Sequence, residues 1–186
     1  MKRRSAAVLL LSLALCACGD AGDTDSQTAG QKLADAFSPA AEAAAPPAPI
    51  DQAFANAIAA DDAYDLAAAK LAEQMGRRDD IRLFAGQMAQ DHAVAAQELQ
   101  DALKRTHGVA GSGQMTADQR RSLEDLRRAG GRFDDAYAKQ AIAAHEQELA
   151  ALRDYADNGM DPALSEFAAN AANMAADHLR LARKLS

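Results

Sequence analysis

The sequence IRLFAGQMAQDHAVAAQEL, which runs from Ile81 to Leu99, is typical of one amphipathic helix. Its apolar residues recur every three or four positions, which is the spacing of one face of an α-helix. That face also carries His92, one turn after Met88, where a leucine would be expected. A histidine on the inward face raises the question of whether other helices place polar groups at the same depth.

The composition of the 186 residues indicates an all-α protein. Hydrophobic residues make up 49% of the chain and aromatic residues only 4%. Much of the apolar content is alanine, a strong helix former. No stretch alternates apolar and polar residues as a half-buried strand does. The formal net charge of −7, without a basic stripe, argues against nucleic acid as a partner.

Four long segments, at residues 51–75, 79–106, 132–157 and 162–185, carry the helical apolar periodicity. Asp51 is expected to cap the first helix, and Asp161 followed by Pro162 is a strong start signal for the last. Short connections within the first and last pairs predict a four-helix bundle. A shorter helix that begins at Thr116 is expected between the second and third long helices, on the surface.

The first 18 residues, MKRRSAAVLLLSLALCAC, predict a signal peptide, because a basic start precedes an apolar run too short to span a bilayer. The end of this stretch, Leu15-Cys16-Ala17-Cys18, resembles the bacterial lipobox. By that resemblance cleavage precedes Cys18, whose thiol then carries a diacylglycerol. The alternative is an ordinary secretory signal that is cut near Ala17 or Ala21.

The expected organisation is therefore a lipoprotein signal peptide at 1–17, a lipidated Cys18 with a flexible tether at 18–50, and a helical bundle at 51–186. The tether is rich in Ala, Gly, Ser, Asp and Pro, which favour a disordered spacer. The lipid anchor predicts a periplasmic protein held at a membrane. Gly19 follows Cys18, in place of the Asp that retains enterobacterial lipoproteins in the inner membrane, and so favours the outer membrane.

Each long helix has one polar candidate on its inward face: Asp65, His92, His145 and His178. Neutral imidazoles and a carboxylate are usual ligands of Fe, Cu, Zn and Mn. Bundle cores hold such sites between facing helices. Met88 and Met174 each lie four residues before one of these histidines, and their thioethers are possible soft ligands that would favour copper.

Two alternatives to a metal site remain open from the sequence. The polar layer could serve only to fix the register of the helices. Haem, with His92 and His178 as axial ligands, is the weaker alternative. The acids beside the histidines are expected to face water or bond a neighbouring helix, with Glu148 the better placed because it lies one turn beyond His145; they are Asp91, Glu146, Glu148 and Asp177.

Several segments resemble the bacterial family known as domain of unknown function 4142, over residues 51–185. The most specific shared positions are Met88, Asp91, His92, Phe133, Asp134, Tyr137, His145 and His178. The resemblance implies a ferritin-like four-helix bundle that is secreted or lipid-anchored. The family has no established activity to transfer.

The chain departs from the pattern of that family in the acids. Family members carry two acids near the end of the first motif, and here Asp65 matches the first while Ala67 replaces the second. The chain also lacks the Glu-x-x-His pair that ferritin-like di-iron sites use. A carboxylate-rich di-iron centre is therefore not expected.

The sequence thus predicts a lipid-anchored periplasmic bundle that binds a transition metal through an inward His and Asp layer. The alternative is a non-enzymatic envelope or stress-related protein-interaction module with a purely structural polar core. No catalytic triad, phosphate loop or dinucleotide fingerprint is present, so the sequence gives no reason to expect an enzyme. The anchor makes the membrane a partner, and a protein partner is not identified.

Overall fold

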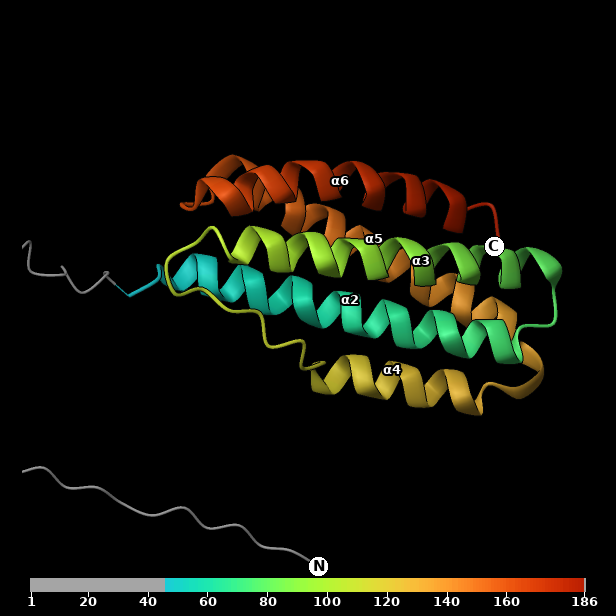
Figure 1. Ribbon diagram of the computed structural model, residues 1–186. Coiled ribbons are helices and arrows are strands. Elements are labelled where there is room, and N and C mark those ends of the chain that lie inside the picture. Colours follow the sequence, from blue (N-terminus) through green and yellow to red (C-terminus); the bar gives the residue numbers. More distant parts are fainter. Residues whose placement is uncertain (1–45, 186) are drawn as a thin grey trace, which may run out of the picture. The chain divides into compact units, whose positions relative to one another are not determined.

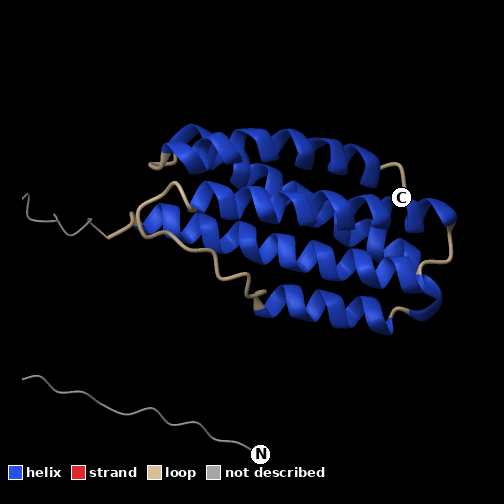
Figure 2. Cartoon of the chain, viewed as in Figure 1, coloured by secondary structure: helices blue, strands red, loops and turns tan. Residues whose placement is uncertain are grey.

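The computed structural model describes residues 46–185, and within this range the chain folds into helices and loops without a strand (Figure 2). The elements are α2 (Pro49–Met75), α3 (Asp79–Leu103), α4 (Ala117–Arg128), a 3₁₀ turn (Gly130–Arg132), α5 (Phe133–Asn158) and α6 (Pro162–Ala182). The predicted all-α bundle is confirmed. The predicted signal peptide, Cys18 and all but the end of the tether lie outside the described residues.

The four long helices form a bundle of two antiparallel hairpins (Figure 1). α2 and α3 make the first hairpin, and α5 and α6 make the second. After α3 the chain returns along the length of the bundle through α4, which lies beside α2, before α5 begins (Figure 1). One long crossover of this kind is the connectivity of ferritin-like bundles. As a result α3 contacts α6, and α2 contacts α5.

Two predicted helix starts are confirmed by their caps. The Asp161 carboxylate accepts hydrogen bonds from the backbone N–H groups of Ala163 and Leu164, with Pro162 at the first helical position. Thr116 and Gln119 form a reciprocal capping box at the start of α4. These local bonds fix where α6 and α4 begin, because they satisfy backbone N–H groups that have no partner within the helix.

The predicted start of the first helix is wrong. α2 begins at Pro49, whose fixed φ suits the first helical position, and Asp51 lies inside the first turn. Asp51 is buried and accepts a hydrogen bond of 2.5 Å from the Tyr155 hydroxyl and one of 3.3 Å from the Met160 N–H. Its role is therefore to join α2 to the turn between α5 and α6.

Two predicted helix ends lie too far along the chain. α3 ends at Leu103 and not at Thr106, and α6 ends at Ala182 and not at Leu185. In both cases the helix gives way to tight turns whose backbone N–H groups bond three residues back. A last helical turn of this narrower 3₁₀ type is common at helix ends, because it gives hydrogen-bond donors to carbonyl groups that have none within the helix.

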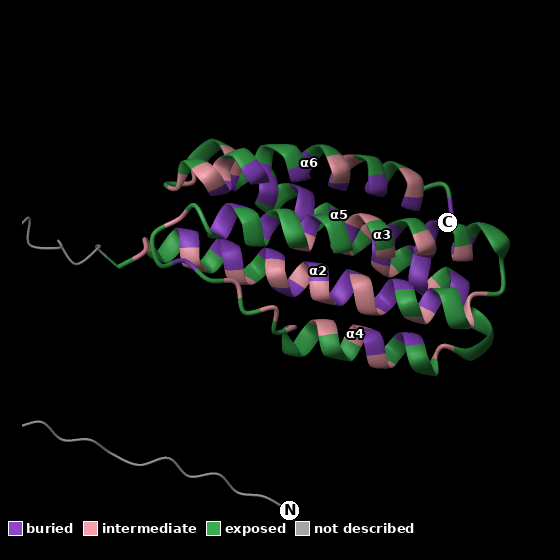
Figure 3. Ribbon diagram, viewed as in Figure 1, coloured by how far each residue is buried: buried purple, intermediate pink, exposed green. Residues whose placement is uncertain are grey.

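The core consists of two apolar clusters, one toward each end of the bundle. Figure 3 shows buried residues on each of the long helices. The first contains Phe54, Leu99, Tyr155 and Phe167, and the second contains Ile81, Phe84, Met88, Phe133 and Tyr137, among others. The buried acids Asp51 and Asp134 lie at opposite ends of the bundle, where each accepts hydrogen bonds at a turn. The other buried acids and the buried histidines fall between or at the margin of the clusters, and these six polar residues form a layer across the middle of the core.

The short helix α4 lies on the outside, as predicted. It buries Leu123 and Leu126, and its other face is charged and exposed. No helix among the described residues combines the length and the apolarity that crossing a membrane requires.

Candidate metal centre

The polar layer brings together side chains from all four long helices. Each of them is almost completely removed from solvent, with exposures of 0% to 6%. They are Asp62 and Asp65 on α2, His92 on α3, His145 and Glu148 on α5, and His178 on α6. Burying charged groups at this depth is costly unless they are paired or bind a cation.

The three histidines form a compact triangle. Their ring centroids lie 5.2 to 5.5 Å apart, so His178 is level with the other two and not offset by a turn. Counting residues from the turns near Gly76 and Gly159 spreads the four candidates over a longer part of the bundle axis, because these two turns lie at opposite ends of the bundle (Figure 1). The structure therefore places the three imidazoles closer together than the sequence predicted.

His92 is held by the two acids of α2. Its Nδ1 donates to Asp62 Oδ1 at 2.9 Å, and its Nε2 lies 3.8 Å from Asp65 Oδ2. Asp62 and Asp65 are three residues apart, so both carboxylates project from one face of α2 toward α3. The ring of His92 is thereby fixed with Nε2 pointing into the layer.

His145 is held by its own helix. Its Nδ1 lies 2.8 Å from the carbonyl oxygen of Ala141, which can only accept, so the proton of a neutral ring sits on Nδ1. Nε2 of His145 then carries a lone pair. It lies 3.4 Å from Nε2 of His92, inside the layer.

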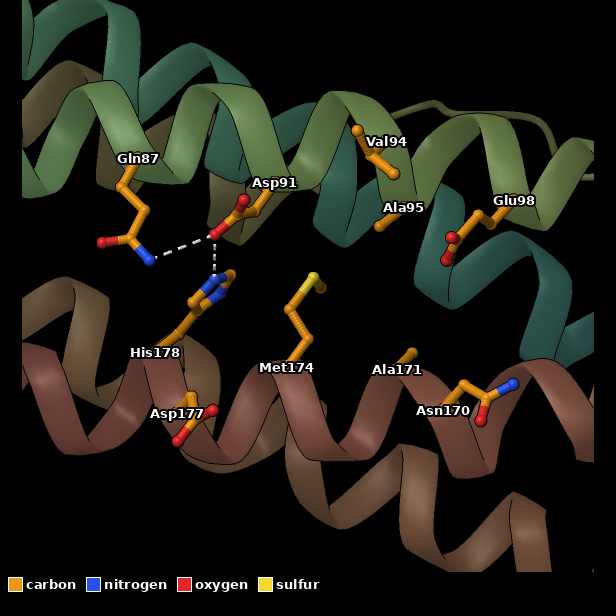
Figure 4. Close-up of a pocket in the computed structure, with 10 residues that line it drawn as sticks. All are labelled: Gln87, Asp91, Val94, Ala95, Glu98, Asn170, Ala171, Met174, Asp177 and His178. Atoms are coloured by element: carbon orange, nitrogen blue, oxygen red, sulfur yellow. Dashed lines mark hydrogen bonds and ion pairs between the residues drawn. The ribbon is translucent and has the colours of Figure 1, made fainter.

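His178 is held from outside the layer by Asp91 of α3. Its Nε2 donates to Asp91 Oδ2 at 2.9 Å, as Figure 4 shows. Its Nδ1 is buried and has no hydrogen-bond partner among the described residues. This nitrogen therefore presents a second free lone pair within the cluster.

The acids of the layer also have unsatisfied atoms. One carboxylate oxygen of each of Asp62, Asp65 and Glu148 is buried without a hydrogen bond in the described part of the chain. Buried polar atoms without a partner are rare in native proteins, and an unseen ion is one recognised reason.

Two overlapping sets of side chains have the spacing that a metal ion requires. In each set one ligand atom per residue lies within 4.8 Å of all the others. The first set is His92, His145 and His178, and the second is Asp65, His92, His145 and Glu148. The predicted candidates Asp65, His92, His145 and His178 each belong to at least one set, Met88 and Met174 belong to neither, and Glu148 is added.

The surroundings of the three histidines give them different pKa values. Burial lowers the pKa of His145 to about 4, and burial also lowers that of His178 to about 4 against the opposing effect of its bond to Asp91. Burial opposes protonation of His92 too, but its bond to Asp62 and the charges of Asp65 and Glu148 raise its pKa to about 9. Burial raises the pKa of Asp65 and of Glu148. At neutral pH the layer therefore holds one cationic and two neutral imidazoles.

Each histidine shows the support that metal-bound histidines usually have. The ring nitrogen that faces away from the centre donates to a carboxylate or a backbone carbonyl, which fixes the tautomer and the ring orientation. Three imidazoles with one or two carboxylates suit Zn, Fe, Mn or Cu. The residues present therefore fit a transition-metal ion.

The structure places three acids that the sequence had left open or had not identified. Glu148 was expected to face water or a neighbouring helix, but it is 2% exposed inside the layer. Asp91 was expected to face water or to bond a neighbouring helix, and it does the second, because it accepts a hydrogen bond from His178 of α6. Asp62 was not identified from the sequence, which gave Asp65 as the one inward polar candidate of this helix. Asp62 and Glu148 thus place two further buried carboxylates near Asp65, in spite of Ala67.

The two methionines lie at different depths. Met88 is buried in the apolar cluster at one end of the bundle, and Met174 lines a groove beside His178 (Figure 4). A haem plane between His92 and His178 does not fit this arrangement, because their ring centroids are only 5.3 Å apart and the ring of His145 lies against both.

Comparison with known proteins gives one match. The family model described as "Domain of unknown function (DUF4142)" matches residues 36–185. No curated protein and no solved structure matches the chain.

Proposed function

The chain belongs to the DUF4142 family, whose function is unknown, and we propose that it binds a transition-metal ion at His92 and His145, with the site completed either by His178 or by Asp65 and Glu148. One observation supports this proposal more strongly than the other observations do. The Nε2 atoms of His92 and His145 face each other at 3.4 Å while their Nδ1 atoms are already bonded to outer partners. At neutral pH a proton on Nε2 of His92 fills this position, and a metal ion that displaced the proton would have both nitrogens as ligands.

The proposed role is to hold or hand on an ion, and not to turn over a substrate. All three imidazoles are at most 1% exposed. Catalytic metal sites keep a coordination position open to water or substrate. Complete burial of the donors suits a binding protein better than an enzyme.

We further propose that the bundle works in the periplasm on a lipid anchor at Cys18, at the outer membrane. The support is the basic and apolar start of the sequence and its resemblance to a lipobox. No cysteine follows Cys18, so the bundle uses no thiol as a metal ligand.

A structural polar core is the competing function, and a specific observation favours it. Two of the histidines already have a carboxylate partner, Asp62 for His92 and Asp91 for His178, and such pairs can fix helix register without a metal. Under this alternative the protein would act through its surface on another protein. The unpaired atoms of Asp65, Glu148 and His178 have no role in it.

A thermal-shift experiment separates the two. A ligand that binds only the folded state raises the melting temperature in proportion to its affinity and concentration. Chelator-treated protein is melted with Zn²⁺, Cu²⁺, Mn²⁺ or Fe²⁺ added in turn, with Mg²⁺ as the hard-cation control. The metal-site proposal predicts a rise with at least one transition metal that His145→Ala abolishes. The structural alternative predicts no rise with any of them.

A further inference from the structure

A groove of about 480 Å³ runs between α3 and α6 and reaches the histidine cluster. Three acids line it, Asp91, Glu98 and Asp177, and no lysine or arginine does (Figure 4). A groove with charge of one sign and low-dielectric walls raises the local concentration of counter-ions and their rate of association. The lining of this groove therefore favours cations.

His178 forms the boundary between this groove and the centre. It lines the groove although it is only 1% exposed, and its Nδ1 has no partner in the described structure. The other two histidines of the triangle do not line the groove. A solute in the groove thus meets the ring of His178 before it meets His92 or His145.

The hydrogen bond that holds the ring of His178 in place lies beside the groove, because both of its partners line the groove. The Nε2 of His178 donates to Asp91, and the side chain of Asp91 is 37% exposed. Met174 lies one helical turn before His178, and its sulfur points across the groove toward α3 (Figure 4). A carboxylate, an imidazole and a thioether thus line the inner end, and all three side-chain types coordinate transition metals.

The hollow between α2, α4 and α5 offers a less suitable way in. It is lined by Asp61 and Asp118 but by no member of the histidine triangle. Its acids are partly paired, Asp61 with Gln119 and Asp118 with Arg121, and so is Asp177 of the groove, with Arg180. Pairing therefore does not distinguish the two hollows, and the position of the histidines does. This hollow therefore serves as the internal comparison for any test of an entry route.

We propose that the metal ion enters the centre through the groove between α3 and α6, and that His178 with Asp91 forms its gate. The carboxylates of Glu98 and Asp177 attract the hydrated ion. The bond between His178 and Asp91 opens, the ring turns about its Cβ–Cγ bond to let the ion pass, and the ring then binds the ion from the inside. This inference rests on the proposed metal site.

The charge of the groove is tested by the rate of uptake of Co²⁺ by the full chain, followed by absorbance in a stopped-flow instrument. The variant that combines Glu98→Gln with Asp177→Asn is expected to take up Co²⁺ about tenfold more slowly at low ionic strength. High salt should remove most of that difference, because it screens exposed charges. The amount of Co²⁺ bound at equilibrium should not change, since neither residue belongs to the ligand sets.

The matched control removes two exposed acids from α4, through Asp118→Asn with Asp125→Asn. Its net charge change is the same, and it should load at the wild-type rate. The path itself is tested by Val94→Trp, which places a large ring in the mouth of the groove at a residue that is 57% exposed. Ala143→Trp places the same ring in the α2–α4–α5 hollow.

The expected pattern is slow uptake for both groove variants and normal uptake for both controls. Wild-type uptake rates in the groove variants, or equal slowing by Ala143→Trp, would overturn the entry route while leaving the metal site in place. If the wild-type chain binds no Co²⁺ at equilibrium and none of the other transition metals, the metal site and the entry route are both wrong.

Discussion

The Nε2 atoms of His92 and His145 lie 3.4 Å apart in the interior of the bundle, and only one of them can carry a proton. The carbonyl of Ala141 fixes the proton of His145 on Nδ1, so its Nε2 can only accept. His92 already donates from Nδ1 to Asp62, and a second proton on its Nε2 would satisfy both rings. A proton on His92 and a metal ion are therefore competitors for the same position.

Metal binding should release protons at neutral pH. The pKa of His92 is raised to about 9, and burial raises that of Glu148, so both hold protons before the ion arrives. His145 and His178, with pKa values of about 4, have none to lose. Calorimetry of Zn²⁺ binding at pH 7, in two buffers with different ionisation enthalpies, is expected to show release of about one to two protons. Identical binding enthalpies in both buffers would contradict this competition.

The metal-free protein should lose stability as the pH rises from 7 to 9. The folded-state pKa of His92 lies above its ordinary value of 6.5, so its protonated form stabilises the fold. That contribution is complete below pH 6.5 and is lost as the pH passes 9. The loss in free energy of unfolding is on the order of 2–3 kcal/mol. Urea denaturation with a chelator present measures it, and a free energy that stays flat or rises over this range would disprove the prediction.

Replacing His92 should cost more stability than replacing His178 in the metal-free protein. His92→Ala leaves Asp62 and Asp65 buried without their cation, which typically costs about 3–5 kcal/mol. His178→Ala leaves Asp91, which is 37% exposed and can bind water, at a cost of about 1–2 kcal/mol. Chemical denaturation of both variants under identical conditions tests the order. Equal losses would mean that Asp62 and Asp65 do not depend on His92.

The contact between Tyr155 and Asp51 provides a test of stability alone. Tyr155→Phe removes the hydroxyl that donates to the buried Asp51 carboxylate, which should lower the free energy of unfolding by about 1–3 kcal/mol. This contact lies in the turn region at the end of the bundle, within the cluster of Phe54 and Phe167. The metal content of the folded variant should equal that of the wild type, and a parallel loss of metal would show that the centre depends on general stability.

The proposed anchor predicts a change in fractionation. Cys18→Ala removes the thiol that the lipobox resemblance assigns to the lipid, so the protein should move from the membrane fraction to the soluble periplasmic fraction. Labelling of growing bacteria with a radioactive fatty acid should mark the wild-type protein and not the variant. A wild-type protein that remains unlabelled would support the ordinary secretory signal instead.

The helices and the inward histidines could be predicted from the sequence because they depend on local periodicity. His92, His145 and His178 all replace an apolar residue on a regular stripe, and all three are buried as expected. The caps at Thr116 and Asp161 are also local signals, and both are confirmed. The sequence placed the three histidines in the middle region of the bundle, and their arrangement as a triangle at one level came from the structure.

The acids could not be placed in the same way. α2 contacts α3, α4 and α5, so it is buried over a broad face and a single stripe does not decide between Asp61 and Asp62. Asp62 lies three residues before Asp65, and Glu148 three residues after His145, and this shared spacing is the signal that could have identified both. The contact between Asp91 and His178 depends on the packing of α3 against α6, which no local pattern contains.

The metal-to-protein ratio of the full chain, purified without chelator, tests the central claim most directly. The metals are quantified by mass spectrometry, and we expect one transition-metal ion per chain in the wild type. His92→Ala and His145→Ala should lose it, while His107→Ala, a change at an exposed histidine outside the cluster, should keep it. A wild-type protein that has no stoichiometric metal, and that takes up none when transition-metal salts are added, would contradict the account.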